Sequence, residues 1–227
     1  MNSIERGNGT PERLLDAAEE IFAREGFRAT TLRAVTARAG VNLAAANYHF
    51  GSKRELLQAV FERRMLPRNR ARVARLRQLR EAARGAGRRP EVRDIILTMM
   101  ESVIGRERSE GRERFGAFIA RSFLDPDPTV RTAFSAFMRP AFRATLDALA
   151  EALPGLPRRT LFWRLQFAIG AIARVNLLSH TDGKAMLDAP SPEPGALVDE
   201  LAAFAAAGMA VAPATAPPRA TRTRRKK

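Results

Sequence analysis

The chain contains no cysteine and only two histidines among its 227 residues. The absence of cysteine excludes disulfide bonds and thiolate metal sites. Histidines and carboxylates do not recur at the spacing of metal ligands, so we expect no metal ion and no bound cofactor. Folding must therefore rest on an apolar core.

Residues suited to catalysis are equally sparse. Ser179, His180 and Asp182 are neighbours in the sequence, whereas a catalytic triad is assembled from separate elements of a fold. No carboxylate pair lies in an apolar setting, and no glycine-rich phosphate loop is present. We predict that the protein is not an enzyme, and catalysis stays an alternative that an unchanged phenotype of a His180→Ala variant would remove.

Long hydrophobic runs are also absent. No segment reaches the roughly 18 to 20 apolar residues that span a bilayer. The N-terminal stretch MNSIERGNGTPE lacks the apolar region of a signal peptide. Apolar residues still make up 45% of the chain, which suits one or two domains with cores. We therefore expect a soluble cytoplasmic protein without a membrane partner.

The net charge of +15 is unevenly distributed. Residues 1–66 hold ten basic and eight acidic residues, and residues 91–210 hold 14 and 15. The excess lies in residues 67–90, with nine basic and one acidic residue, and in residues 211–227, with six basic and no acidic residues. A nucleic-acid partner fits this charge, but the N-terminal part must gain affinity from a few well-placed groups.

Each of the two basic segments allows two interpretations. Residues 66–90 predict a connector helix with arginine on its polar faces, followed by a loop at Gly85, Gly87 and Pro90. This connector is either solvated or a site for an anion, such as DNA phosphate or the phosphates of a coenzyme A thioester. Residues 1–9 and 211–227 are predicted to be disordered, and the tail adds either salt-sensitive DNA affinity or only solubility. A non-specific DNA-binding protein that uses these basic segments is thus an alternative function.

The clearest local signals lie in residues 40–53, GVNLAAANYHFGSK. Gly40 suits the turn that ends a helix, because glycine adopts positive φ without steric cost. Asn42 is placed to cap a helix over 43–50, and Ser52 begins an S-x-x-E capping box that starts the next helix. A helix N-terminus beside Lys53 is a natural phosphate site.

Two further helices are predicted before this stretch. Thr10 and Pro11 are typical of an N-cap and a first helical position, and this helix ends at Gly26. Thr31 is placed to cap a second helix over 32–39. Helix, helix, tight turn and helix is the helix-turn-helix plan, in which the last helix enters the DNA major groove. We therefore predict a DNA-binding domain over residues 10–65.

Residues 91–210 predict a second helical domain. Five helical stretches are expected, near 92–106, 112–124, 129–153, 157–180 and 194–210. Pro140 is expected to kink or split the third of them. Since no stretch argues for a strand, the predicted class is all-α, with about nine helices.

Three motifs, in order between Thr10 and Val60, resemble the TetR family of bacterial transcriptional regulators: LLDAAEEIFAREGF, TTLRAVTARAGV and NYHFGSKRELL. The resemblance implies a repressor that binds a palindromic operator as a homodimer and responds to a small apolar ligand in its C-terminal domain. The form V-N-x-A-A-x-N-Y-H-F-G-S-K is similar to a subgroup that includes regulators of fatty-acid metabolism, which implies a fatty acid or an acyl-CoA as the ligand.

The resemblance also assigns residues to the double-stranded DNA contact. Thr31 would contact a phosphate, and Arg33 a phosphate or a guanine. Asn47 suits a paired contact with adenine, whereas the neighbouring leucine and alanines offer only close approach and thymine-methyl contacts. Tyr48 and His49 would hold the DNA backbone. The full predicted set is Thr31, Arg33, Asn42, Leu43, Ala44, Ala45, Asn47, Tyr48, His49 and Lys53.

Aromatic and methionine side chains of the C-terminal domain are candidates for a ligand pocket, although most of them must belong to the core. Arginine or asparagine among them would suit a ligand carboxylate or phosphate. The candidate pocket residues are Met99, Phe118, Arg121, Phe137, Phe142, Trp163, Phe167, Arg174 and Asn176. The resemblance places dimerisation in the last two long helices, through Leu165, Ile169, Ile172, Leu197, Leu201, Phe204 and Gly208.

Overall fold

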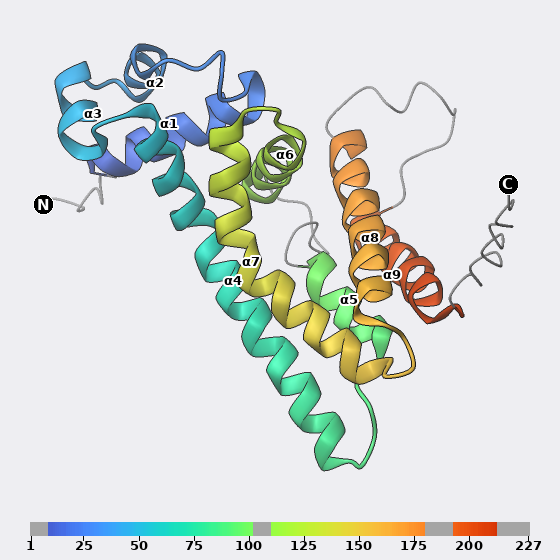
Figure 1. Cartoon of the computed structure of the whole chain (residues 1–227). Coiled ribbons are helices and arrows are strands. Elements are labelled where there is room, and N and C mark those ends of the chain that lie inside the picture. The colour runs from blue at the N-terminus through green and yellow to red at the C-terminus, as the bar shows by residue number, and fades with distance from the viewer. Residues whose placement is uncertain (1–8, 102–109, 180–192, 213–227) are drawn as a thin grey trace, which may run out of the picture.

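The computed structural model describes residues 9–101, 110–179 and 193–212, and within these ranges it contains α-helices and no strand (Figure 1). The predicted all-α class is confirmed, and the described residues form nine helices. None of these helices is long and apolar enough to cross a membrane. The helices are α1 (Thr10–Glu25), α2 (Leu32–Ala39), α3 (Leu43–Phe50), α4 (Lys53–Gly85), α5 (Val92–Glu101), α6 (Glu110–Leu124), α7 (Pro128–Ala152), α8 (Arg158–Ser179) and α9 (Pro194–Ala210).

Side-chain caps position the two helices of the helix-turn-helix unit. Thr31 Oγ1 accepts a hydrogen bond from the Ala34 amide at 3.1 Å, and Asn42 Oδ1 accepts one from the Ala45 amide at 2.7 Å. Gly40 ends α2 in the left-handed region, with φ of 64°. The predicted caps and the predicted turn are confirmed, because each depends on a few neighbouring residues.

The start of α1 differs from the prediction. Thr10 is already helical, Gly9 occupies the N-cap position, and no side chain caps the helix. The expectation that Thr10 is the N-cap is therefore wrong. The helix begins without a side-chain cap because Pro11 presets φ in its first turn, and the N–H that proline lacks would have no intrahelical partner there.

α4 is a helix of 33 residues that connects the two ends of the molecule (Figure 1). The Ser52 hydroxyl accepts a hydrogen bond from the Glu55 amide at 3.2 Å, which is one half of the predicted capping box. The Glu55 carboxylate accepts from the Ser52 hydroxyl at 2.8 Å, whereas the Ser52 amide donates to the Phe50 carbonyl at 2.6 Å. The predicted border at residue 65 falls inside this helix. The basic connector is thus the second half of α4 and the loop that follows it.

Two apolar cores lie along α4: an upper core at its N-terminal end and a lower core at its C-terminal end, as Figure 1 is oriented. The upper core is formed by α1, α2, α3 and the first part of α4, together with parts of α6 and α7. The Phe61 ring lies within it, and its centroid is 5.0 Å from that of the Phe118 ring and 5.9 Å from that of the Phe137 ring. The lower core lies among the C-terminal part of α4 and α5, α7, α8 and α9. Because Phe118 and Phe137 come from α6 and α7, the N-terminal helices pack directly on the C-terminal ones.

Pro140 lies inside α7 without splitting it, and α7 continues from Pro128 to Ala152. Proline removes an N–H from the helix and crowds the preceding turn. In that turn, the Phe137 carbonyl accepts a hydrogen bond of 2.8 Å from the side-chain amide of Asn69. This bond joins α7 to α4 midway between the two cores.

Candidate nucleic-acid interface and ligand cavity

α3 turns small and polar residues toward the solvent. Ala46 is buried against the core, whereas Ala44, Asn47, Tyr48 and His49 are exposed. The Tyr48 side chain is 85% exposed, and its ring meets that of His49 edge to face at 5.1 Å between centroids. Tyrosine combines an apolar ring with a hydroxyl that seeks a hydrogen-bond partner. This face of α3 is therefore suited to contact another molecule rather than to pack within the chain.

The N-terminus of α2 is a second candidate for DNA contact. Thr31 and Arg33 are both exposed there. The lone pairs of Thr31 Oγ1 serve the cap, which leaves the hydroxyl hydrogen to donate to a phosphate. The partial positive charge at a helix N-terminus and the guanidinium of Arg33 both favour an anion.

Lys53 has a structural function that the motif did not predict. Its ammonium group donates to the carbonyl oxygens of Phe27 and Thr30, both at 2.8 Å, and lies 4.3 Å from the centroid of the Phe27 ring. Two of its three N–H donors thus hold the loop between α1 and α2 against the start of α4. A phosphate contact through the third donor stays a prediction.

A buried carboxylate joins α1 to α4. Glu19 is 3% exposed, and it forms ion pairs with Arg63 at 3.2 Å and with Arg64 at 2.9 Å. Arg63 also pairs with Asp16 at 2.9 Å. These contacts orient the first helix of the DNA-binding domain on α4, the helix that runs on into the C-terminal domain.

Arg121 joins α6 to the end of α1. Its guanidinium donates to the carbonyl oxygens of Arg24 at 3.2 Å and Glu25 at 2.9 Å. Gly26 lies beneath it with φ of 83°, and a Cβ at Gly26 would be 2.9 Å from the guanidinium. The prediction that Arg121 lines a ligand pocket is wrong, because its charge is used to satisfy the carbonyls at this helix end.

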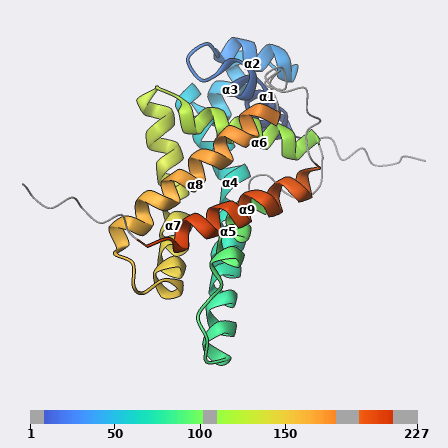
Figure 2. The same cartoon turned by 90° about the vertical axis from the view of Figure 1, so that its right-hand side faces the viewer.

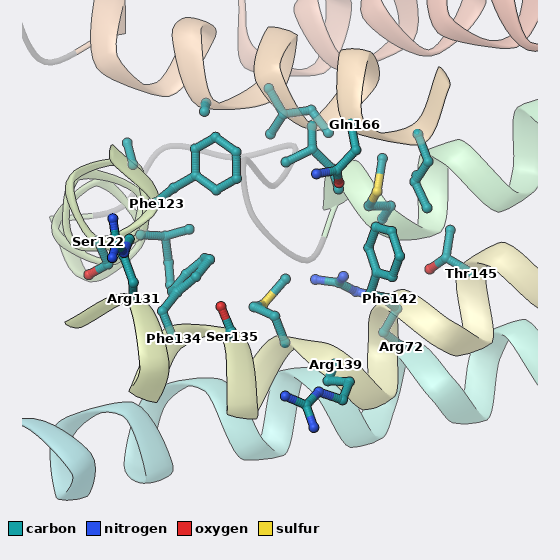
Figure 3. Close-up of a pocket in the computed structure, with 18 of the residues that line it drawn as sticks. Arg72, Ser122, Phe123, Arg131, Phe134, Ser135, Arg139, Phe142, Thr145 and Gln166 are labelled. Carbon is teal, nitrogen blue, oxygen red and sulfur yellow. The ribbon is translucent and has the colours of Figure 1, made fainter. Parts of the chain in front are cut away.

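A mostly apolar cavity of about 380 Å³ lies between α4, α5, α6, α7 and α8 and is partly open to the surface (Figure 3). Its size is at the lower end of the range for small-molecule sites. Among the described residues its wall contains no carboxylate. The lining residues are Arg72, Met99, Ile119, Ala120, Ser122, Phe123, Arg131, Phe134, Ser135, Met138, Arg139, Phe142, Thr145, Phe162, Leu165, Gln166, Ile169, Ile172 and Ala173.

Three cavity residues also pack against the core of the DNA-binding domain. Ile119, Phe134 and Met138 line the cavity and belong to the apolar cluster that contains Phe61. The Phe134 ring lies 6.1 Å from the Phe61 ring, between centroids. One layer of side chains therefore separates the cavity from the core on which α3, the candidate DNA-reading helix, rests.

The wall of the cavity contains one deeply buried cation. Arg72 of α4 is only 5% exposed, and burial lowers the pKa of its guanidinium to about 10. Arg131 and Arg139 also line the cavity, but both are exposed. Among the described lining residues, Arg72 thus carries the most deeply buried positive charge.

Two models of known protein families match this chain, one over the DNA-binding helices and one over the C-terminal helices. Residues 14–60 match the family model of bacterial regulatory proteins, tetR family, and residues 98–208 match the model of the C-terminal domain of tetracyclin repressor-like proteins. The chain belongs to the TetR family of bacterial regulators. It is therefore a DNA-binding transcriptional regulator and not an enzyme, and regulators of the TetR family bind DNA as dimers.

The similarity to curated TetR-family relatives is confined to the DNA-binding end. Over 58 residues, the chain is 41% identical to two proteins of Pseudomonas putida, the HTH-type transcriptional regulator SrpR and the uncharacterized HTH-type transcriptional regulator TtgW. The match covers 26% of this chain, 27% of SrpR and 43% of TtgW, so it spans less than half of either relative.

Solved structures share the fold over nearly the whole chain. NalD, the secondary repressor of the MexAB-OprM multidrug efflux pump in Pseudomonas aeruginosa, has a TM-score of 0.64 at 21% identity, over 88% of this chain and 94% of that chain. The fatty acid degradation regulator FadR from Bacillus halodurans has a TM-score of 0.63 at 13% identity, over 90% of this chain and 98% of that chain. At these identities the likeness concerns the fold.

Two of the predicted pocket residues, Met99 and Phe142, line the cavity. Four others do not: Phe118 and Phe137 pack on Phe61 in the core of this TetR-family protein, and Trp163 and Phe167 are exposed on α8. Those four assignments are wrong because apolar residues occupy several faces of these helices, and composition does not tell core from cavity or from solvent. Arg174 is exposed and is not among the lining residues, and the side chain of Asn176 lies outside the described part.

The predicted dimer residues of α8 lie on the side that faces the cavity. Leu165 and Ile172 are buried, Ile169 is half-buried, and all three line the cavity inside the protomer. The exposed apolar residues of this region are instead Trp163 (51%) and Phe167 (70%) of α8 and Phe204 (72%) of α9. α8 and α9 lie together on one face of the molecule, which is turned to the viewer in Figure 2.

α9 agrees better with the predicted interface. Phe204 and Gly208 are exposed, and a Cβ at Gly208 would meet nothing within 4 Å. Leu197 and Leu201 are half-buried, and Leu201 packs on the lower core. An apolar ring beside a small residue on an exposed helix permits a second helix to approach closely.

The basic connector extends away from the reading helix. A helix rises 1.5 Å per residue, so Arg84 lies roughly 45 Å along α4 from its start beside α3. The far end of the connector therefore cannot reach the DNA that α3 would contact, which disfavours that alternative for these arginines. The predicted disordered termini and His180 with Asp182 lie outside the described residues, except for Gly9, Val211 and Ala212.

Proposed function

We propose that the protein is a ligand-responsive repressor that binds a palindromic operator as a homodimer and releases it when an apolar small molecule fills the cavity. The observation that carries this proposal is the shared wall, in which Ile119, Phe134 and Met138 line the cavity and pack on the core beneath α3. A regulator that binds chromosomal DNA would act in the cytoplasm.

The DNA contact would be made by α3 and by the start of α2. Asn47 would form a paired contact with adenine, and the alanines would allow the helix backbone to come close to thymine methyl groups. Tyr48, His49 and Arg33 would hold phosphates on either side. Residues 1–66 carry a net charge of only +2, so the affinity of one copy would be low and a second copy would be needed.

The exposed residues of α8 and α9 would supply the dimer. Trp163 and Phe167 are exposed one turn apart on α8, and Phe204 is exposed on α9, which packs on α8; burying them against a copy would remove that area from water. A two-fold interface there would place two copies of α3 on successive major grooves, roughly 34 to 36 Å apart. The operator would then be a palindrome.

Ligand binding would act through packing. A molecule that fills the cavity would push on Phe134 and Met138, which cannot shift without moving the rings around Phe61. If the resulting conformation spaces the two reading helices wrongly, DNA affinity falls by the difference in ligand affinity between the two conformations. NalD, a repressor, and FadR, a regulator of fatty acid degradation, share the fold, which supports a regulatory role for this chain.

The test is selection of DNA by the full chain from a random duplex pool, followed by mobility shift at moderate salt. We expect an inverted repeat with half-sites centred about one helical turn apart. Asn47→Ala and Tyr48→Ala should weaken binding to it, whereas Gln78→Ala, on the exposed far part of α4, should not. Recovery of no preferred sequence would contradict the proposal and favour a non-specific DNA-binding protein.

A further inference from the structure

The cavity has a polar centre that is placed for an anion. Figure 3 shows Arg72 extending from α4 into the space between α7 and α8, while Gln166 reaches toward the same region from α8. Arg72 is buried, and the described lining residues include no aspartate or glutamate. Guanidinium and amide N–H groups would thus converge on the same part of the cavity.

The rest of the wall suits an apolar body. Met99, Phe142, Phe162 and Leu165 surround the polar centre, and the lining is apolar over most of its area. A volume of about 380 Å³ accommodates one alkyl chain of moderate length or a small ring system. The nucleotide and pantetheine parts of a coenzyme A thioester exceed this volume and would have to lie outside the opening, so the group that reaches the buried Arg72 is small.

We propose that Arg72 and Gln166 bind the carboxylate of an amphipathic acid whose apolar part occupies the remainder of the cavity. This proposal rests on the proposed ligand-responsive function and specifies the chemistry of the ligand. A guanidinium offers five N–H donors in a planar fork, which can bind a carboxylate through two parallel hydrogen bonds alongside its existing contacts. Burial strengthens such charge-assisted bonds, because little water competes.

The position of Arg72 also connects ligand recognition with the DNA-binding end. Asn69, one turn earlier on α4, is bonded to the Phe137 carbonyl of α7, and Phe61 lies on the same helix within the upper core. Lys53 starts this helix and holds the loop before α2. A carboxylate on Arg72 therefore acts directly on the helix that carries the reading domain.

The experiment is isothermal titration calorimetry of the full chain with two matched pairs of probes: decanoic acid with 1-decanol, and 3-phenylpropanoic acid with 3-phenyl-1-propanol. At neutral pH and below the micellar concentration, we expect at least one acid to bind tenfold or more tightly than its alcohol. Arg72→Met should reduce the affinity for that acid at least tenfold and leave the alcohol within about threefold. The control Arg75→Met, at an exposed position of the same helix outside the cavity wall, should leave both unchanged.

Because Arg72 is buried, its variant needs a check of folding. Arg72→Lys keeps a charge but not the planar fork, and it should give an intermediate affinity if the paired contact is real. Binding of the alcohols to Arg72→Met reports directly that the cavity has formed. Equal affinity for acid and alcohol, binding of neither pair to the wild-type chain, or loss of both probes in Arg72→Met would overturn the proposal.

The same samples separate this proposal from the proposed function. If an acid binds in a manner that depends on Arg72 but leaves the affinity for selected operator DNA unchanged, the head-group site stands and the ligand response fails. If the acid and the alcohol bind equally and both release DNA, the response stands and the carboxylate assignment fails.

Discussion

Replacing Asn47 with alanine is the sharpest change to the DNA contact that leaves the fold intact. Asn47 is exposed on α3, and its backbone carbonyl, which the substitution keeps, accepts the Gly51 amide at 2.9 Å. Alanine has a higher helix propensity than asparagine. We therefore expect the variant to melt at the same temperature as the wild type or slightly above it.

The expected loss follows from the geometry of the contact. A paired side-chain contact with one base contributes about 1–3 kcal/mol of discrimination. A dimer presents Asn47 twice, so the variant should lose about 2–6 kcal/mol on the selected operator, which raises Kd by about thirtyfold or more. Asparagine carries no charge, so the slope of log Kd against log salt concentration should not change.

The assay is fluorescence anisotropy with the selected duplex and with a scrambled duplex, at three salt concentrations. Asn47→Ala should bind the scrambled duplex as the wild type does and should lose affinity only for the selected one. The Gln78→Ala variant serves as the matched control. An unchanged Kd on the selected duplex, or an equal loss on both duplexes with a shallower salt slope, would refute the assignment of Asn47 to a base edge.

Three further predictions concern stability and assembly. Glu19→Ala removes the buried carboxylate that Arg63 and Arg64 share, while Arg63 keeps its ion pair with Asp16, so it should destabilise the fold by about 1–3 kcal/mol in urea denaturation; an unchanged midpoint would show that the pairs are weak. Phe204→Asp puts a charge into the apolar face of α9 and should give a monomer in sedimentation at micromolar concentration, with at least tenfold weaker operator binding; a persistent dimer would place the interface elsewhere. Hydrogen bonding to Arg80 lowers the pKa of the Glu151 carboxyl. The ionised Glu151 carboxylate therefore stabilises the folded state above the ordinary glutamate pKa, and this stabilisation is lost as the pH falls through the lowered pKa. The Glu151→Gln variant should therefore show a lower Tm than the wild type near neutrality and a smaller fall in Tm between about pH 6 and pH 3; identical pH profiles would contradict this.

The features that could be predicted from the sequence are those set by neighbouring residues. Thr31, Asn42 and Ser52 cap their helices because each side chain meets the backbone amide only three positions later. The same local character makes the exposed face of α3 predictable. Thr10 is the exception, since Pro11 could start its helix without a side-chain cap.

The cavity could not be predicted, because it depends on which helix meets which. α8 is apolar on two sides, one facing the cavity through Leu165 and the other facing solvent through Phe167. A sequence pattern shows both sides alike, so it does not distinguish the side that faces the cavity from the exposed side. Arg72 was missed for the same reason. It stands in a run of arginines, and only its spacing from the buried Asn69 and Leu76 indicates that it faces inward.

The proposed ligand response depends on coupling between the cavity and α3. The most direct measurement is the Kd of the full chain for its selected operator, by fluorescence anisotropy, with and without a saturating concentration of the acid that calorimetry shows to bind. We predict that the acid raises Kd at least tenfold and that, by reciprocity, saturating operator DNA weakens binding of the acid by the same factor. An operator affinity that is identical with the cavity empty and with it filled would contradict the central claim.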